Sequence, residues 1–148
     1  MYAARIQLIE NIIKPALKKG IWVISDRHYL SSFAYQGGGS NIDIKNILML
    51  HKMLLEDFCP NLTFYLDVDP KIGLKRVYTR GVPDRIEKNT LNFFTRTRKK
   101  YLELVRSDPN IITINSNQKI EIVKQILEKK LKKWLKNDQL VSMVNKTL

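Results

Sequence analysis

The residues best suited to chemistry lie in one stretch, Ile21–Ser40, which reads IWVISDRHYLSSFAYQGGGS. An acid and a base, Asp26 and Arg27, follow a short apolar run there. A guanidinium matches a phosphate group with paired hydrogen bonds, and a neighbouring carboxylate can orient it or accept from a water bound to Mg²⁺. Taken alone, this pair could equally be an exposed ion pair at a junction between elements.

A second group of polar side chains follows a few residues later. Ser32, Tyr35 and Gln36 stand at positions i, i+3 and i+4, so a short helix would place them on one face. That face would present a hydroxyl, an aromatic ring and an amide, which together can recognise the edge of a nucleobase. The alternative is a surface helix followed by flexible glycines.

A third group is basic. Arg76 and Arg80 are four residues apart near the end of a predicted helix, and Arg85 follows. Like charges at that spacing destabilise a helix by about 0.2–0.5 kcal/mol, so stability alone does not favour them. They predict a mobile lid over residues 76–88 that closes on a polyphosphate, or else a solvated basic face.

The elements that must position these groups follow from apolar periodicity and breakers. The first expected strand, 21–25, is apolar throughout, as when both faces are buried, and follows a helix with Pro15 inside it and Gly20 at its end. Asp43 and Pro70 mark helix starts. Expected helices cover about 3–19, 31–36, 43–58, 70–79, 89–106 and 119–136, expected strands 21–25, 62–68 and 110–115, and loops 37–41 and 80–88.

Strands that alternate with helices predict an α/β fold with parallel strands and helices on both faces. No linker or repeat divides residues 1–136, and we expect residues 137–148 to form a poorly ordered tail. Arg5 shares the side of its helix with Ile9, an unusual place for a cation unless it meets a buried anion.

Composition narrows the class of protein. The 148 residues are 44% hydrophobic and 27% charged, as in an ordinary soluble domain, and Cys59 is the only cysteine, which suits a reducing cytoplasm. The net charge of +12 favours anionic partners, although compositional bias could explain many lysines. The sequence contains neither a G-x-x-x-x-G-K-[ST] phosphate loop nor a metal-ligand spacing of His and Cys.

Together these strings resemble bacterial thymidylate kinases. The resemblance rests on YAARIQL, SDRH-x-x-SS-x-AYQGGG, TFYLDVDP-x-x-GLKR, DRIE and FFTRTRKKYLEL. It implies a P-loop-kinase-like, doubly wound parallel sheet, of which this chain carries the C-terminal two-thirds and lacks the N-terminal strand, P-loop and helix. It further implies Mg²⁺-dependent transfer of the ATP γ-phosphate to dTMP, giving dTDP for dTTP synthesis, in a cytoplasmic homodimer.

The resemblance also assigns roles by position. Arg5 and Arg27 would hold the dTMP phosphate, and Asp26 would stand near the metal, through water. Ser32 and Gln36 would read the thymine, with Tyr35 supporting sugar and base. The lid arginines that act on the transferring group would be Arg76, Arg80 and Arg85, and the loop against adenine would include Asn115, Ser116 and Gln118.

Two other hypotheses stay open on the sequence alone. A misplaced start, a frameshift or gene decay would each produce the incomplete chain that the resemblance implies. The first alternative is a degenerate, inactive remnant that keeps the fold but not the reaction and binds dTMP weakly or not at all. A basic nucleic-acid-binding protein could use Lys129, Lys130, Lys132 and Lys133 of the last helix. The second ranks lower because it leaves the Ser32–Gln36 face unexplained, and we expect neither a nucleic acid nor a membrane as partner.

Overall fold

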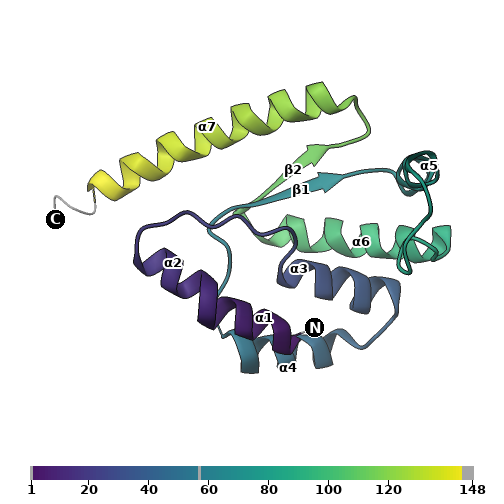
Figure 1. The fold of residues 1–148 in the computed structure, drawn as a ribbon, viewed down its shortest axis with the longest axis horizontal. Helices are drawn as coiled ribbons and strands as arrows, with labels where there is room; N and C mark the ends of the chain where they lie inside the picture. The colour runs from purple at the N-terminus through teal and green to yellow at the C-terminus, as the bar shows by residue number, and fades with distance from the viewer. Residues whose placement is uncertain (1, 57, 145–148) are drawn as a thin grey trace. The chain divides into compact units, whose positions relative to one another are not determined.

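The computed structural model describes residues 2–56 and 58–144, with side chains up to Asn137. The chain divides into two compact units: residues 1–61 with 89–107, and residues 62–88 with 108–148. The first unit is helical, and the second holds a sheet of two parallel strands (Figure 1). The expected α/β class with parallel strands is therefore confirmed.

The first unit begins with a helix in three pieces: α1 (Tyr2–Leu8), the π-helical η1 (Ile9–Ile13) and α2 (Lys14–Lys18). Pro15 explains the middle piece, because proline has no N–H to donate within a helix. The Lys14 amide donates to the Ile9 carbonyl, five residues back. The predicted kink at Pro15 thus takes the form of a π-helical turn, and Gly20 follows with a positive φ of 73°.

The segment 21–25 corrects the sequence prediction, since it is not a strand. Ile24 is 98% exposed and Trp22 is 69% exposed, whereas a strand buried on both faces was expected. An apolar run becomes a strand only where a neighbour supplies ladder hydrogen bonds. In the described part of the chain the sheet consists of two strands in the other unit, so this segment belongs to no strand.

The next helix is longer than expected. It consists of α3 (Tyr29–Ser32) and the π-helical η2 (Phe33–Gly39), so the glycines expected in a loop are helical. The helix α4 (Ile44–Leu55) begins after Asp43, whose side chain accepts from the Lys45 amide at 2.9 Å, as the sequence predicts for an N-cap. The helix α4 ends at Leu55, before the expected Phe58.

The helix α6 (Leu91–Ser107) completes the first unit. It lies beside α3 and η2 (Figure 1). A separate apolar cluster, built on Ile9, Ile13 and Leu55, joins the first helix to α4. The first unit is therefore held together by contacts between helices that come from distant parts of the sequence.

The second unit contains β1 (Thr63–Asp67) and β2 (Ile111–Asn115), which pair in parallel with Thr63 opposite Ile111. After β1, the helix α5 (Pro70–Arg80) begins with Pro70 in its first turn. In β2, Ile114 is 1% exposed and Ile111 is 8% exposed. Both strands match their predictions closely, and the Ile and Thr residues of β2 are β-branched, as suits a paired strand.

The last helix, α7 (Ile120–Val144), continues past Lys136, where the sequence predicts its end. Residues 137–144 are thus helical where a poorly ordered tail was expected, and residues 145–148 lie outside the described residues. Repeated Leu and Lys favour helix, and the stretch 137–144 holds neither Gly nor Pro to stop it. Within residues 2–56 and 58–144, no helix has the length and apolar content needed to cross a membrane.

Candidate functional site

In the first unit, Arg5 of α1 reaches α3 and the residue before it. Its guanidinium donates to the Ser32 hydroxyl at 3.0 Å and to the His28 carbonyl at 3.3 Å. Ser32 is 1% exposed, so this contact lies at the buried edge of the helix. Arg5, which the sequence places on the apolar side of its helix, therefore donates to two neutral oxygen atoms. Neither of them neutralises its positive charge, so Arg5 can still attract an anion.

Arg27 lies over the ring of Tyr35, with its guanidinium carbon 5.3 Å from the ring centroid. Its φ of 69° is left-handed, which costs a residue with a Cβ about 1–2 kcal/mol. The Ser25 hydroxyl donates to the Arg27 carbonyl at 2.9 Å and holds this turn. Strained backbone that persists beside polar side chains is typical of binding sites. Asp26, next to it, is exposed.

Gln36 presents an unused acceptor. Its side-chain oxygen Oε1 is buried and has no hydrogen-bond partner in the described part of the chain. A buried polar atom without a partner costs about 1–3 kcal/mol, so it marks a place where a ligand donor would be stabilising. Ser32 is the last residue of α3, and Tyr35 and Gln36 lie in the π-helical η2 that continues it.

Two histidines lie near Arg5. Burial, helped by the charges of Arg5 and His51, lowers the pKa of His28 to about 4. Burial and Arg5 also lower the pKa of His51. Tyr29 has its ring 5.6 Å from the ring of His28 and 4.8 Å from that of His51. Both histidines are therefore neutral near pH 7, and Arg5 is the cation of this cluster.

In the second unit, Arg76 of α5 reaches the loop after β2. Its guanidinium donates to the carbonyls of Ser116, Asn117 and Gln118 at 2.7, 3.2 and 3.1 Å. Three carbonyl acceptors occupy much of its donor capacity. The structure thus places Arg76 against the loop that was expected at the adenine, which begins at Asn115.

Arg80 and Arg85 lie in the predicted lid. Arg80 forms a two-pronged ion pair with Glu87, at 2.8 and 2.9 Å, and Glu87 also accepts from the Asp84 amide. Arg85 is exposed. These contacts hold residues 80–87 of the predicted lid in a turn.

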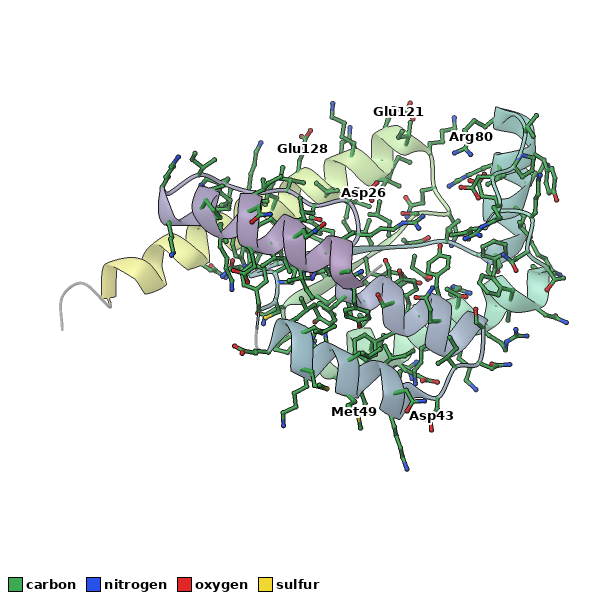
Figure 2. The ribbon with its side chains drawn as sticks, turned by 60° about the horizontal axis from the view of Figure 1, so that its bottom comes forward. Asp26, Asp43, Met49, Arg80, Glu121 and Glu128 are labelled. Atoms are coloured by element: carbon green, nitrogen blue, oxygen red, sulfur yellow. The ribbon has the colours of Figure 1, made fainter. Side chains whose placement is uncertain are left out.

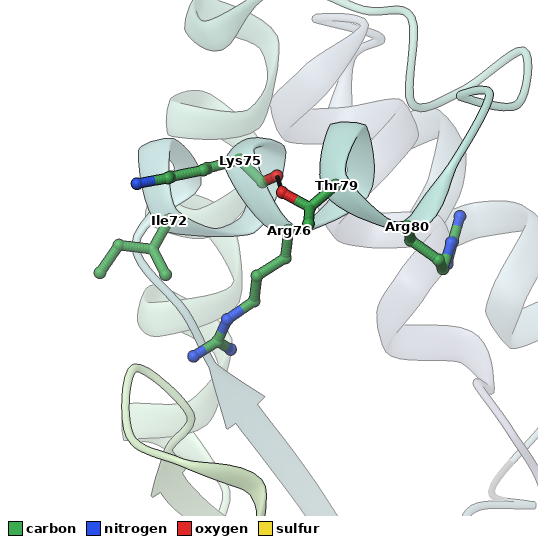
Figure 3. Close-up of a pocket in the computed structure, with 5 residues that line it drawn as sticks. All are labelled: Ile72, Lys75, Arg76, Thr79 and Arg80. Atoms are coloured by element: carbon green, nitrogen blue, oxygen red, sulfur yellow. Dashed lines mark hydrogen bonds between the residues drawn. The ribbon is translucent and has the colours of Figure 1, made fainter.

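One side of α5 is hollowed into a pocket of about 570 Å³ (Figure 3). It is lined by Ile72, Lys75, Arg76, Thr79 and Arg80. Three of these five side chains are cationic, so the pocket suits an anion.

The predicted site residues divide between the two units. The first unit contains Arg5, Asp26, Arg27, Ser32, Tyr35 and Gln36, and the second contains Arg76, Arg80, Arg85, Asn115, Ser116 and Gln118.

Comparison with known proteins assigns the family. A sequence model described as thymidylate kinase matches residues 1–127. The thymidylate kinase of Buchnera aphidicola subsp. Baizongia pistaciae is 53% identical over 139 residues, which are 94% of this chain and 66% of that protein. The chain belongs to the thymidylate kinase family.

Two further relatives agree with this assignment. The thymidylate kinase of Buchnera aphidicola subsp. Schizaphis graminum is 57% identical, and that of Vibrio parahaemolyticus is 53% identical, each over 135 residues. Those residues are 91% of this chain and 64% of each relative. The chain thus spans about two-thirds of the length of the thymidylate kinases that it matches.

Sequence reasoning missed one residue that the structure places beside the site. Arg96 of α6 donates to the carbonyls of Gly38 and Gly39, at 3.3 and 2.6 Å. The available signal was its position within FFTRTRKKYLEL, one turn after Phe93, on a helix that already resembled the family.

Proposed function

We propose that this chain contributes the dTMP-binding part of a thymidylate kinase, which transfers the ATP γ-phosphate to dTMP and gives dTDP for dTTP synthesis. The observation that carries the proposal is the unpartnered Oε1 of Gln36, on the same continuous helix as Ser32 and Tyr35. Thymine carries a ring N–H at N3, which is the donor that a buried amide oxygen requires.

The phosphate of dTMP would meet Arg5 and Arg27. Both guanidiniums lie against aromatic rings of the first unit, Arg5 over Tyr2 at 5.0 Å and Arg27 over Tyr35 at 5.3 Å. Stacking leaves the N–H donors at the edge of a guanidinium able to meet phosphate oxygens. Arg5 uses two of its five N–H groups on Ser32 and His28, and the others would serve the phosphate. In this proposal Tyr35 also supports the sugar and base of the nucleotide.

ATP would meet the basic pocket on α5. Arg80 now pairs with Glu87, and the Arg80 side chain is 69% exposed whereas that of Glu87 is 20% exposed. A triphosphate would approach Arg80 from solvent and compete with Glu87 for its guanidinium. Arg76, Arg80 and Arg85 would act on the transferring group. Arg76 would also hold, through its hydrogen bonds to the carbonyls of residues 116–118, the loop that lies against adenine with Asn115, Ser116 and Gln118.

Mg²⁺ fits this arrangement only as a phosphate-bound ion. Among the described residues, no group of three or more His, Cys, Asp or Glu could hold a metal. Mg²⁺ in kinases keeps several waters and is bound mainly through substrate phosphates. The exposed carboxylate of Asp26 is suited to accept a hydrogen bond from one of those waters. When bound, the ion would neutralise charge on the polyphosphate.

The homodimer is part of the same proposal. The face of α4 that bears Leu48, Met49 and Met53 is 50%, 64% and 72% exposed at these side chains, and Met49 points outward in Figure 2. Apolar patches of this kind are typical of protein interfaces. Light scattering on the purified chain should give twice the mass of a monomer, and Met49→Glu should lower it, with Lys18→Glu, at an exposed position on α2, as the control. We place the enzyme in the cytoplasm, which suits the free Cys59.

Calorimetric titration of the purified chain with dTMP tests the proposal. The Gln36→Ala variant should weaken dTMP binding about tenfold, which corresponds to about 1.4 kcal/mol. Gln7→Ala removes an exposed glutamine from the same unit and should bind as the parent chain does. Formation of dTDP from ATP and dTMP is then followed by chromatography. A chain that binds no dTMP would contradict the proposal and favour the inactive remnant.

A further inference from the structure

The end of η2 comes unusually close to α6. A Cβ built on Gly38 would lie 2.7 Å from the Lys100 Cβ, and one built on Gly39 would lie 2.5 Å from the Phe93 ring. Real side chains do not approach so closely, because packed atoms repel below about 3 Å. Gly38 and Gly39 therefore let α6 pack directly against the backbone of η2. The sequence instead suggested that these glycines form a flexible loop.

Arg96 covers the same end of η2. Its Nε donates to the Gly38 carbonyl at 3.3 Å, and its Nη2 donates to the Gly39 carbonyl at 2.6 Å. The last carbonyls of a helix lack hydrogen-bond donors within the helix. A basic side chain can donate to them, and its positive charge also interacts favourably with the negative end of the helix dipole. Arg96 thus caps the helix that carries Tyr35 and Gln36.

The helix α6 also holds Tyr35 from a second side. The ring of Tyr35 lies 6.1 Å from that of Phe93 and 6.3 Å from that of Tyr101, in tilted and edge-on arrangements. The Tyr101 and Ser31 hydroxyls are 2.8 Å apart and share a hydrogen bond. The pKa of Tyr101 is raised by burial, so this hydroxyl stays protonated and available for hydrogen bonding.

We propose that Arg96 is a positioning residue for nucleobase recognition. It does not touch the nucleotide; it fixes the register of η2 on α6, and so the place of Tyr35 and the Gln36 amide. This inference rests on the proposed function, because the base that Gln36 reads is thymine there. An arginine is needed because two nitrogens of one planar group reach two successive carbonyls, which the single ammonium of lysine cannot match in geometry.

Hydrogen–deuterium exchange on the unliganded chain tests the capping role first. In Arg96→Ala, amides of residues 35–42 should exchange about tenfold faster, which matches a loss of about 1.4 kcal/mol in local opening. Arg96→Lys should show an intermediate rate. Arg106→Ala removes an exposed arginine from the same helix and should leave these amides unchanged. Unchanged exchange in a folded Arg96→Ala chain would overturn the proposal.

Nucleotide discrimination tests the positioning role. Cytosine has an acceptor at N3 where thymine has a donor, so the parent chain should prefer dTMP to dCMP. Arg96→Ala should reduce the ratio of the two affinities at least about threefold, because a displaced Gln36 distinguishes them poorly. A ratio that stays constant while both affinities fall together would mean a purely structural role and would overturn the inference. If the parent chain binds neither nucleotide, the proposed function fails, and the exchange rates alone decide whether Arg96 caps η2.

Discussion

Arg5 donates a hydrogen bond to the Ser32 hydroxyl at 3.0 Å across 27 positions of the sequence. This contact joins the first helix to the helix that carries Tyr35 and Gln36. A charged donor is thereby placed at the buried edge of the predicted nucleobase face.

The first prediction concerns the stability that this contact supplies. Arg5→Ala should lower the free energy of unfolding by about 1–3 kcal/mol, because a charge-assisted hydrogen bond to a buried hydroxyl is lost. Urea unfolding followed by circular dichroism measures the change. Lys18→Ala, an exposed cation on α2, is the control. An equal midpoint for Arg5→Ala and the parent chain would show that the contact contributes nothing.

The second prediction concerns pH. The pKa of His28 is about 4 in the folded chain, below its ordinary value of 6.5, mainly because of burial. The unfolded chain therefore binds a proton that the folded chain does not, and stability should fall as the pH drops from 6.5 toward 4. His51 acts in the same direction. Urea midpoints measured at several pH values in this range should decline.

His28→Gln provides the comparison for this pH series. It removes one titrating group, so the decline between pH 6.5 and 4 should become shallower. A slope identical to that of the parent chain would mean that His28 titrates normally in the folded state.

The third prediction concerns Arg76, whose guanidinium donates to three successive carbonyls of residues 116–118. Arg76→Ala should speed amide exchange in residues 116–120 several-fold, since the loop loses its main tie to α5. The measurement needs no nucleotide. Lys75→Ala, on the same helix and in the same pocket, should leave the loop as it is. Equal exchange in the two variants would refute the tie.

The fourth prediction concerns residues 21–25, which are apolar enough to predict a buried strand but are not a strand in the structure. Ile24→Asp should change the free energy of unfolding by less than about 0.5 kcal/mol, because Ile24 is 98% exposed. Ile114→Ala, at a position 1% exposed in β2, should cost about 2–5 kcal/mol. A large loss for Ile24→Asp would indicate that residues 21–25 are buried in solution.

Local patterns predicted much of the fold. Asp43 and Pro70 marked helix starts correctly, because a side-chain cap and a ring-fixed φ act within one turn of the chain. The strand Thr63–Asp67 also followed from local composition. The segment 21–25 failed for the opposite reason, since pairing depends on a partner that lies elsewhere in the chain.

By itself, the sequence determined which groups are available: the Asp26–Arg27 pair, the Ser32, Tyr35 and Gln36 spacing, and the strings that mark the family. Only tertiary structure decided how these groups are held. Arg96 reaches Gly38 across 58 positions, and Arg76 reaches Ser116 across 40. Contacts between residues so far apart depend on how helices pack and where carbonyls are left without partners, which no local pattern of residues encodes.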